Sequence, residues 1–342
     1  MIREAIEALV SGRSLTSDAA SAVMEEVMQG EATPAQLGAF VTALRMKGET
    51  VDEIVGLVRA MMSNAIRISV DGPVLDTCGT GGDGRGSFNI STAAAFVAAG
   101  AGLRVAKHGN RAMSSRCGSA DVLETLGVRI DLAPEQVKLC VQDVGIGFLF
   151  APVFHPAMRF AAAPRREIGI RTVFNILGPL CNPAGATSQL LGVADEGLLE
   201  KMALVLRGLG CRHAVVVHGG DGLDEVTTTG ATSICELKDG EVRGYSVSPE
   251  DLGLDRAEPE SLSGGTLDEN AAILRGVLEG RPGPHRDIVL ANAAAALLAG
   301  GSVQTLADGV SLAAETVDGG HALAKLEQLM ELAGSLSVER SA

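Results

Sequence analysis

The chain has 342 residues, of which 46% are hydrophobic, and its formal net charge at pH 7 is −14. This length and composition are typical of a globular protein with two domains, or of one large α/β domain with an appendage. The acidic balance argues against general binding to nucleic acid or to an anionic membrane, so any anion-binding site must be a local exception.

Residues 1–65 have the pattern of four helices. The first turns, MIREAIEALVSG, are charged and lack the apolar segment of a signal peptide, so secretion is not expected. An apolar stripe over residues 23–28 predicts a second helix, and Thr33 before Pro34 predicts the start of a third. Thr50 with Glu53 forms a capping box ahead of a fourth. The sequence therefore predicts an all-helical beginning.

From Val74 onward, segments with the patterns of strands and helices alternate, which predicts a largely parallel sheet flanked by helices. The predicted strands are PVLDTC, LRVAKHG, GIGFLFA, LLGVA and HAVVVHGG. The segment CELKDGEVRGYSV, with Asp239-Gly240 at its tip, predicts a β-hairpin. The predicted helices are an alanine-rich run after residue 90, residues 120–126, residues 198–209 and most of the last part of the chain. The uncharged stretch from Ile288 to Ala307 is too interrupted to span a bilayer and predicts a buried helix.

The stretch DTCGTGGDGRGSFNIST, residues 76–92, lies between the first predicted strand and the alanine-rich helix. Five of the eight residues from Gly79 to Gly86 are glycine. Glycine allows unusual backbone conformations and close approach of a ligand, and the N–H groups of such a loop and of the helix start form an anion site. We therefore expect a phosphate-binding loop.

The same loop matches the dinucleotide pattern GxGxxG at Gly79, Gly81 and Gly84, which keeps a dehydrogenase open as a weaker alternative. In a dinucleotide site the third glycine already lies in the helix, whereas here GRGSFN intervenes. The next predicted strand also ends near Lys107 instead of an acidic residue, although NADP could accept a basic one. The chain has no GxxxxGK[ST] motif, so a P-loop nucleotidase is disfavoured.

Two further segments contain side chains that could bind an anion or a metal ion. The loop GNRAMSSRCGSADVLE is rich in basic and hydroxyl side chains and precedes a helix for which Ser119 is the candidate N-cap, although the loop is also compatible with a solvated turn. The segment HGGDGLDEVTT places Asp221, Asp224 and Glu225 after a predicted strand, where they could hold Mg²⁺ beside a phosphate loop or form a structural turn. Because ligands of open α/β sheets bind at the carboxyl ends of strands, the three loops together predict a Mg-bound polyphosphate substrate.

Six cysteines are scattered through the chain without a CxxC pair, which suits a reducing compartment better than a disulfide framework or a zinc site. They are Cys78, Cys117, Cys140, Cys181, Cys211 and Cys235. We therefore expect a cytoplasmic protein in which most thiols are small core residues.

Five motifs occur in an order that resembles the anthranilate phosphoribosyltransferase family over essentially the whole chain. They are GTGGD at 79–83, NIST at 89–92, KHGNRAMSSRCGSADVLE at 107–124, PRREIGIRTVFNILGPLCNPA at 164–184 and DGLDE at 221–225. The resemblance implies a small helical domain, residues 1–65 joined by about 156–183. It also implies a larger α/β domain that binds phosphoribosyl pyrophosphate, residues 66–155 and 184–342.

The activity that this resemblance implies is Mg²⁺-dependent transfer of the phosphoribosyl group from phosphoribosyl pyrophosphate to the amine of anthranilate, in tryptophan biosynthesis. The implied partners are the two substrates, a second copy of the chain in a homodimer, and a separate anthranilate synthase subunit. A pyrimidine nucleoside phosphorylase shares the architecture, but GNRAMSS and RREIG match the transferase better. A non-enzymatic relative that binds nucleic acid is opposed by the net charge of −14 and by intact motifs.

Residue by residue, the resemblance assigns three groups of site residues. Around phosphoribosyl pyrophosphate it places Gly79, Gly82, Asp83, Ser87, Asn89, Ile90, Ser91, Thr92, Lys107, His108, Gly109, Asn110, Arg111, Ala112, Met113, Ser114, Ser115 and Ser119. The metal ligands are Ser91, Asp224 and Glu225. Anthranilate contacts Gly79, Asn110 and Arg165, with Arg166 as the alternative to Arg165.

No residue is assigned as nucleophile or general base, and His108 in particular is not, because an aromatic amine is already unprotonated near neutral pH. Cys117 stands where relatives carry other small residues, and a thiol near the pyrophosphate loop could be oxidised if it were exposed. We expect a buried residue there.

Overall fold

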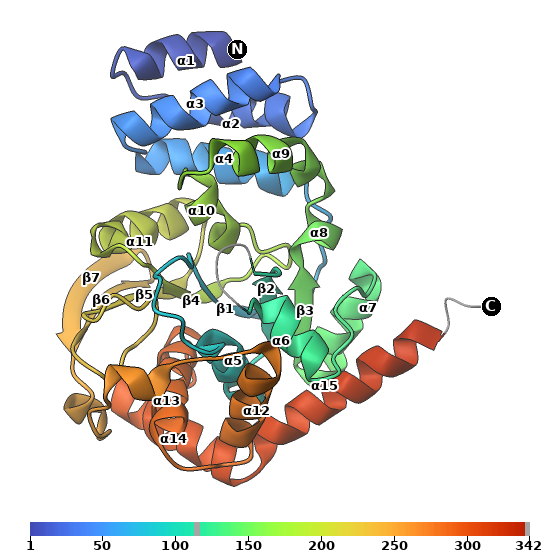
Figure 1. Cartoon of the computed structure of the whole chain (residues 1–342), viewed down its shortest axis with the longest axis vertical. Helices are drawn as coiled ribbons and strands as arrows, with labels where there is room; N and C mark the ends of the chain where they lie inside the picture. The colour runs from blue at the N-terminus through green and yellow to red at the C-terminus, as the bar shows by residue number, and fades with distance from the viewer. Residues whose placement is uncertain (113–116, 339–342) are drawn as a thin grey trace.

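The computed structural model describes residues 1–112 and 117–338 (Figure 1). The strands are β1 (Leu75–Gly79), β2 (Val105–Gly109), β3 (Ile146–Phe150), β4 (Ser188–Gly192), β5 (His213–Gly219), β6 (Thr232–Lys238) and β7 (Glu241–Val247). The helices of the first half are α1 (Ile2–Val10), α2 (Ser17–Met28), α3 (Pro34–Lys47), α4 (Val51–Ser63), α5 (Ile90–Gly100), α6 (Ser119–Thr125) and α7 (Pro134–Leu139). Those that follow are α8 (Ala151–Phe154), α9 (Arg159–Ile168), α10 (Phe174–Leu177), α11 (Leu199–Gly208), α12 (Leu267–Leu278), α13 (Pro284–Ala299), α14 (Leu306–Asp318) and α15 (His321–Val338).

The described strands form a seven-stranded sheet in the order β3-β2-β1-β4-β5-β6-β7. The first five strands of the chain pair in parallel, and β6 and β7 add an antiparallel hairpin, which confirms both predictions. The chain moves from β1 outward to β3 and then returns to the other side of β1 with β4. Such a reversal opens a crevice at the carboxyl ends of the two adjacent strands, where ligands of α/β sheets bind.

The N-terminal helices begin where the caps predicted. Thr33 accepts a hydrogen bond from the N–H of Gln36, and Pro34 occupies the first turn, where its missing N–H costs nothing. Thr50 and Glu53 exchange the two bonds of a capping box. Glu53 is completely buried, but Lys47 Nζ lies 2.9 Å from its carboxylate and compensates the charge.

The sheet is buried on both faces, because alternate side chains of each strand enter different hydrophobic clusters. Leu190 and Val215 join one cluster with helices α5, α6 and α12–α15, and Leu191 and Val216 join another with helices α1–α4, α9, α10 and α11. The second cluster includes Phe174 and the other buried apolar side chains of α9 and α10. Residues 156–183 therefore pack against the N-terminal helices (Figure 1), although the core continues from there to the sheet, and the division into domains stays a prediction.

Helix α13 covers the predicted stretch only from Ile288 to Ala299, where every residue is buried, and the remainder to Ala307 is a largely exposed turn and the start of α14. Helix α13 lies against β1, β4 and β5 on one face of the sheet. Across residues 1–112 and 117–338, no helix combines the length and the apolar character needed to cross a membrane.

Candidate active site

Three segments that are far apart in the sequence meet at the carboxyl end of the sheet. Gly79 and Gly192 are paired at the ends of β1 and β4, and an added Cβ on either glycine would collide with Asp224. The acidic loop after β5 thus passes directly over the crevice where the strand order reverses. These two positions accept only glycine because another segment of the chain occupies the space of a side chain.

The glycine-rich loop between β1 and α5 is held by two side chains. The N–H of Gly81 donates to Asp224 Oδ2 at 2.7 Å. Arg171 donates from Nη1 to the carbonyl of Gly82 at 2.6 Å and from Nη2 to that of Gly81 at 2.9 Å. Gly81 and Gly82 both have positive φ, which only glycine adopts readily. Arg171, which the sequence interpretation did not assign, is therefore the residue that fixes the loop from the other side of the site.

The start of α5 lies next to this loop and presents the backbone N–H groups that a helix leaves without partners. Ile90 is buried in the core, so only its backbone can face a ligand. The backbone carbonyl of Ser91 accepts from Thr77 Oγ1 at 3.0 Å, and its hydroxyl lies 3.3 Å from Lys107 Nζ. Thr92 is 1% exposed, and its Oγ1 has no hydrogen-bond partner among the described residues. A buried hydroxyl without a partner beside a helix N-terminus suits a polar ligand.

Three carboxylates crowd the mouth of the crevice. Loss of solvent and then the charge of Asp83 raise the pKa of Asp224 to about 6. Loss of solvent and then Asp224 raise the pKa of Glu225 well above its usual value, while Lys107 lowers it. Oxygen ligands that disfavour one another's charge are what a bound divalent cation would relieve. Asp224 and Glu225 therefore supply oxygen ligands of the kind that Mg²⁺ prefers, although among the described residues no three His, Cys, Asp or Glu side chains are grouped as a complete metal site.

Asp221 belongs to the same motif but has a structural role. Its carboxylate accepts from the hydroxyls of Thr227 at 2.7 Å and Thr229 at 2.6 Å and from the N–H of Leu223 at 3.1 Å. This residue closes the turn that presents Asp224. Of the two alternatives left open for the segment, the turn applies to Asp221.

Lys107 is buried beneath the site. Its Nζ donates to the carbonyl of Thr77 at 2.6 Å and lies 3.3 Å from Ser91 Oγ. Burial lowers the pKa of Lys107, and the charges of Asp76 and Glu225 partly restore it. Asp76 is fully buried in the adjacent strand, and burial raises its pKa to about 6. Lys107 is thus a fixed positive charge between two carboxylates.

His108 faces the core below the basic loop that follows β2, residues 110–118, which we call the second loop. Its ring lies 5.1 Å from that of His155, and burial together with His155 lowers its pKa to about 3. Its backbone N–H donates to Asp76 Oδ1 at 3.2 Å. A ring with this pKa is a weak base at neutral pH.

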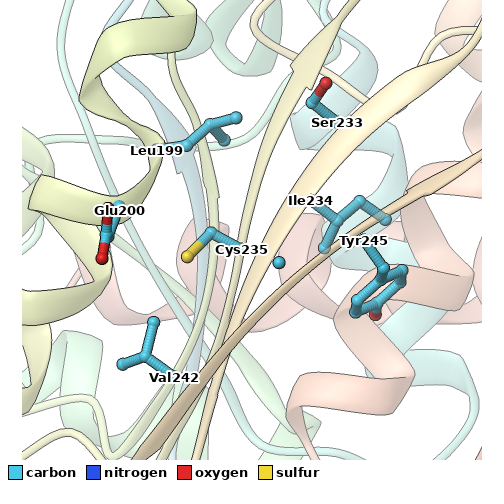
Figure 2. Close-up of a pocket in the computed structure, with 8 residues that line it drawn as sticks. Leu199, Glu200, Ser233, Ile234, Cys235, Val242 and Tyr245 are labelled. Atoms are coloured by element: carbon cyan, nitrogen blue, oxygen red, sulfur yellow. The ribbon is translucent and has the colours of Figure 1, made fainter.

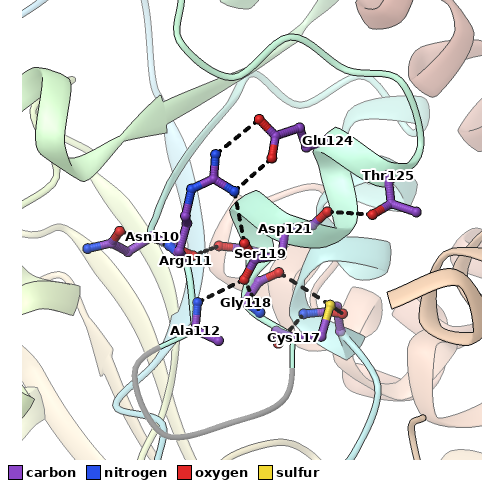
Figure 3. Close-up of polar contacts among 10 residues, drawn as sticks. Asn110, Arg111, Ala112, Cys117, Gly118, Ser119, Asp121, Glu124 and Thr125 are labelled. Atoms are coloured by element: carbon purple, nitrogen blue, oxygen red, sulfur yellow. Dashed lines mark hydrogen bonds and ion pairs between the residues drawn. The ribbon is translucent and has the colours of Figure 1, made fainter. Parts of the chain in front are cut away.

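The second loop is tied at both ends to α6 (Figure 3). Asp121 Oδ2 accepts from the N–H groups of Ala112 and Gly118, both at 2.9 Å. Arg111 does not extend toward the crevice: its guanidinium donates to both oxygens of Glu124, at 2.7 and 3.0 Å, and to Asp121. Met113, Ser114 and Ser115, which the resemblance assigned to the substrate, lie outside the described residues.

Ser119 and its neighbours differ in one detail from the expectation. The N-cap of α6 is Gly118, so the prediction that Ser119 caps the helix is wrong. Ser119 is the first helical residue, and its Oγ lies 3.4 Å from the carbonyl of exposed Asn110. A Cβ on Gly109 would collide with Ser119 Oγ, so the hydroxyl lies over the end of β2. Position 118 requires glycine, because a side chain there would collide with the backbone of Ala112 and Arg111.

Cys117 joins the second loop to the start of α5. Its thiol donates to Asn89 Oδ1, and Asn89 Nδ2 donates to the Cys117 carbonyl, both at 3.2 Å. The residue is buried, and burial raises the pKa of its thiol. The side chain of Asn89 is therefore occupied by hydrogen bonds within the protein, and its backbone is the part that can face a substrate.

We expect Cys117 to resist alkylation in the folded enzyme. Because the thiolate is the reactive form, burial and a raised pKa should slow its modification by iodoacetamide about tenfold or more relative to the unfolded chain. Peptide mapping by mass spectrometry, with and without urea, measures the two rates. Rapid modification of Cys117 in the folded protein would show that the thiol is accessible and reactive.

A short segment before α12 also holds the glycine loop, and the sequence interpretation gave it no role. Ser263 forms an antiparallel bridge with Ser87, and the N–H of Gly264 donates to the carbonyl of Gly86 at 2.8 Å. A side chain on Gly264 would collide with Asn270 Oδ1 and with the backbone nitrogen of Phe88. The pair Gly264-Gly265 is typical of a turn in the sequence, but it gives no indication of a partner.

Arg165 is the better placed of the two candidate arginines in α9. Its guanidinium stacks 4.9 Å from the ring centre of Phe174, and burial lowers its pKa, whereas Arg166 is exposed. A stacked, partly desolvated guanidinium is well suited to bind a planar carboxylate in bidentate fashion.

A shallow hollow of about 410 Å³ lies away from these residues, between α11 and the β6–β7 hairpin (Figure 2). Its wall is formed largely by apolar side chains such as Leu199, Cys235 and Val242. None of the predicted site residues lines it. We therefore place the candidate site at the crevice and not in this hollow.

Comparison with known proteins gives a consistent result. The α/β-domain model of a glycosyl transferase family matches residues 71–323, and the helical bundle model of that family matches residues 3–65. An anthranilate phosphoribosyltransferase of Dehalococcoides mccartyi is 57% identical over 339 residues, 98% of this chain and 99% of the relative.

Solved structures agree over the same length. The anthranilate phosphoribosyltransferase of Thermus thermophilus superimposes with a TM-score of 0.92 at 45% identity, covering 96% of this chain and 99% of that one. The Saccharomyces cerevisiae enzyme, in complex with PRPP and Mg, superimposes with a TM-score of 0.89 at 29% identity, covering 98% of both chains.

Proposed function

The chain belongs to the anthranilate phosphoribosyltransferases, enzymes of tryptophan biosynthesis, and we propose that the crevice at the carboxyl ends of β1, β2 and β4 is where it transfers the phosphoribosyl group to anthranilate. The observation that carries the proposal is the meeting of the glycine loop, Lys107 and the Asp224–Glu225 loop at the point where the strand order reverses. Neither alternative function, that of a nucleoside phosphorylase or that of a nucleic-acid-binding relative, is needed to explain this arrangement.

In the reaction, the amine nitrogen of anthranilate forms a bond to C1 of the ribose while the bond from C1 to the pyrophosphate oxygen breaks. The nitrogen lone pair makes the new bond, the leaving pyrophosphate keeps the electrons of the old one, and the ammonium proton that results is lost to solvent. The backbone N–H groups at the start of α5 and in the glycine loop would bind the phosphates in place of water. Orientation and charge stabilisation then account for catalysis without a strong general base, which agrees with the low pKa of His108.

Ser91, Asp224 and Glu225 would hold Mg²⁺, which when bound neutralises charge on the pyrophosphate. The support within this chain is that burial, followed by the charges of neighbouring carboxylates, raises the pKa of both Asp224 and Glu225. The support from relatives is the yeast enzyme described with PRPP and Mg. Arg171 and Asp224 would hold the glycine loop in the shape that receives the substrate.

Arg165, with Asn110 and Gly79, would bind anthranilate. Arg165 supplies a desolvated guanidinium for the carboxylate, and its stacking on Phe174 fixes the plane of that group. Gly79 lies where the two substrates would meet, at the end of β1.

The loss of anthranilate fluorescence on adding enzyme, Mg²⁺ and phosphoribosyl pyrophosphate tests this assignment. We expect Arg165→Ala to raise the KM for anthranilate about 10- to 100-fold, because a charge-assisted bidentate contact is lost, with a much smaller change in the KM for phosphoribosyl pyrophosphate. Arg166→Ala, an exposed neighbour in the same helix, is the matched control and should leave both constants near wild type. An effect confined to phosphoribosyl pyrophosphate would show that the two pockets had been exchanged.

A homodimer and a separate anthranilate synthase subunit are further parts of the proposal. The homodimer rests on the family resemblance, and so does the synthase subunit.

A further inference from the structure

Helix α13 contains one polar side chain in a stretch where every other side chain is apolar. The residues from Ile288 to Ala299 are all buried, and Asn292 is 0% exposed at their centre. Burying an amide in such surroundings is costly unless its hydrogen bonds are made. Asn292 therefore needs a partner, and the identity of that partner indicates what the residue does.

The partner is the backbone of the acidic loop. Asn292 Oδ1 accepts from the N–H of Val226 at 2.8 Å, and Nδ2 donates to the carbonyl of the same residue, also at 2.8 Å. The second hydrogen of Nδ2 goes to the carbonyl of Ile288 in the same helix, at 2.8 Å. A flipped amide would place donor against donor at Val226, so this geometry holds in one orientation only.

Val226 directly follows the pair Asp224 and Glu225. On the other side of that pair, the turn is closed by Asp221, whose carboxylate accepts from Thr227 and Thr229. Asp224 and Glu225 thus lie between two anchored parts of one short loop, and Asp224 Oδ2 also accepts from the N–H of Gly81 at 2.7 Å. A rigid attachment of Val226 to a core helix is the means by which the loop stays over the crevice.

We propose that Asn292 is a positioning residue, which fixes Asp224 and Glu225 for metal binding through the backbone of Val226. This proposal rests on the proposed role of that pair as metal ligands. Groups that orient metal ligands from behind commonly contribute tenfold to a hundredfold in metal affinity or activity.

The test uses Asn292→Ser, which keeps a small polar group that cannot span both backbone groups of Val226, and Asn292→Leu as a similar-sized apolar variant. We expect the Mg²⁺ concentration for half-maximal activity to rise about 10- to 100-fold, with an unchanged KM for anthranilate and recovery of rate at high Mg²⁺. Mn²⁺ binding, followed by the EPR signal of the free ion with phosphoribosyl pyrophosphate present, should weaken by a similar factor. Hydrogen exchange of the peptide around Val226 should become faster.

Thr316→Val is the matched control, because Thr316 is also buried and its hydroxyl donates within its own helix, to the Leu312 carbonyl at 2.7 Å. It should leave Mg²⁺ dependence and Mn²⁺ binding unchanged. Folded Asn292 variants with wild-type Mn²⁺ affinity and Mg²⁺ dependence would overturn the proposal. If Asp224→Asn with Glu225→Gln also bound Mn²⁺ like wild type, the metal assignment itself would be wrong, and the role of Asn292 would fall with it.

Discussion

Replacing Asp224 by Asn together with Glu225 by Gln should lower turnover by about 10³-fold and leave the fold intact. The amides keep the size of the side chains, and the new amide at position 224 would retain an oxygen to accept from the N–H of Gly81. They remove the charges that a divalent cation needs. Because burial and neighbouring carboxylates raise the pKa of both Asp224 and Glu225, the variant should unfold at the same or a higher temperature in the absence of metal.

The chain offers a matched control one strand away. Asp195 and Glu196 form the same Asp-Glu pair after β4, at the same edge of the sheet, but they are exposed and bond to Gly197 and Ser233. Asp195→Asn with Glu196→Gln should keep turnover within about twofold of wild type, as for surface changes generally. Steady-state kinetics and thermal unfolding of both double variants measure the comparison. Near-normal turnover in the Asp224 and Glu225 variant would contradict the metal assignment.

The sequence predicted the fold well because its signals were local. Caps at Thr33 and Thr50, and the Asp239-Gly240 turn, each depend on a few adjacent residues. The alternation of strands and helices then favoured a mostly parallel sheet over other fold classes. The strand order was not accessible in this way, since nothing in a single strand states that β4 returns to the other side of β1.

The parts of the site that the sequence did not reveal are those made by distant pairs. Arg171 bonds to the glycine loop about ninety positions away, and Gly264 pairs with Gly86 across a still longer separation. A lone arginine or a glycine pair carries no mark of its partner. Asn292 was visible only as an interruption of an apolar run, and its meaning comes from the position of Val226 in space.

Ser119 and Asp221 show a different limit of prediction from sequence. The residue type indicated an important position in each case, but it did not determine the role of the residue. Serine and glycine both serve as N-caps, so the choice of Gly118 over Ser119 depended on the close approach of Ala112 and Arg111. Asp221, Asp224 and Glu225 are chemically similar, and only the threonine hydroxyls around Asp221 separate a turn residue from the candidate ligands.

Lys107→Met should lower the free energy of unfolding by about 3 kcal/mol at neutral pH and abolish most of the activity. The methionine fills similar space, but it leaves the carbonyl of Thr77 without its donor and removes the positive charge between Asp76 and Glu225. Both carboxyl groups are then buried without a positive charge beside them. Lys238→Met, at an exposed position, is the control and should change stability by less than about 0.5 kcal/mol.

The loss in this variant should depend on pH in a defined direction. In the wild type, burial raises the pKa of Asp76 to about 6, above its unfolded value of about 3.9, while Lys107 lowers it. Without Lys107 that pKa rises further, so the folded variant binds a proton more tightly than the folded wild type does. A raised carboxyl pKa costs stability as pH increases through it, so the deficit should be small below about pH 6 and grow above it.

Urea unfolding of wild type and variant at about pH 5.5 and about pH 8 separates charge from shape as the cause, since these two pH values lie on either side of the Asp76 pKa of about 6. A deficit that is clearly smaller at the lower pH means that Lys107 stabilises the fold through its charge. An equal deficit at both values would mean that the packing of its methylene chain is responsible. In that case the charge would serve the phosphates of the substrate and not the fold, and activity would be lost at both pH values to the same extent.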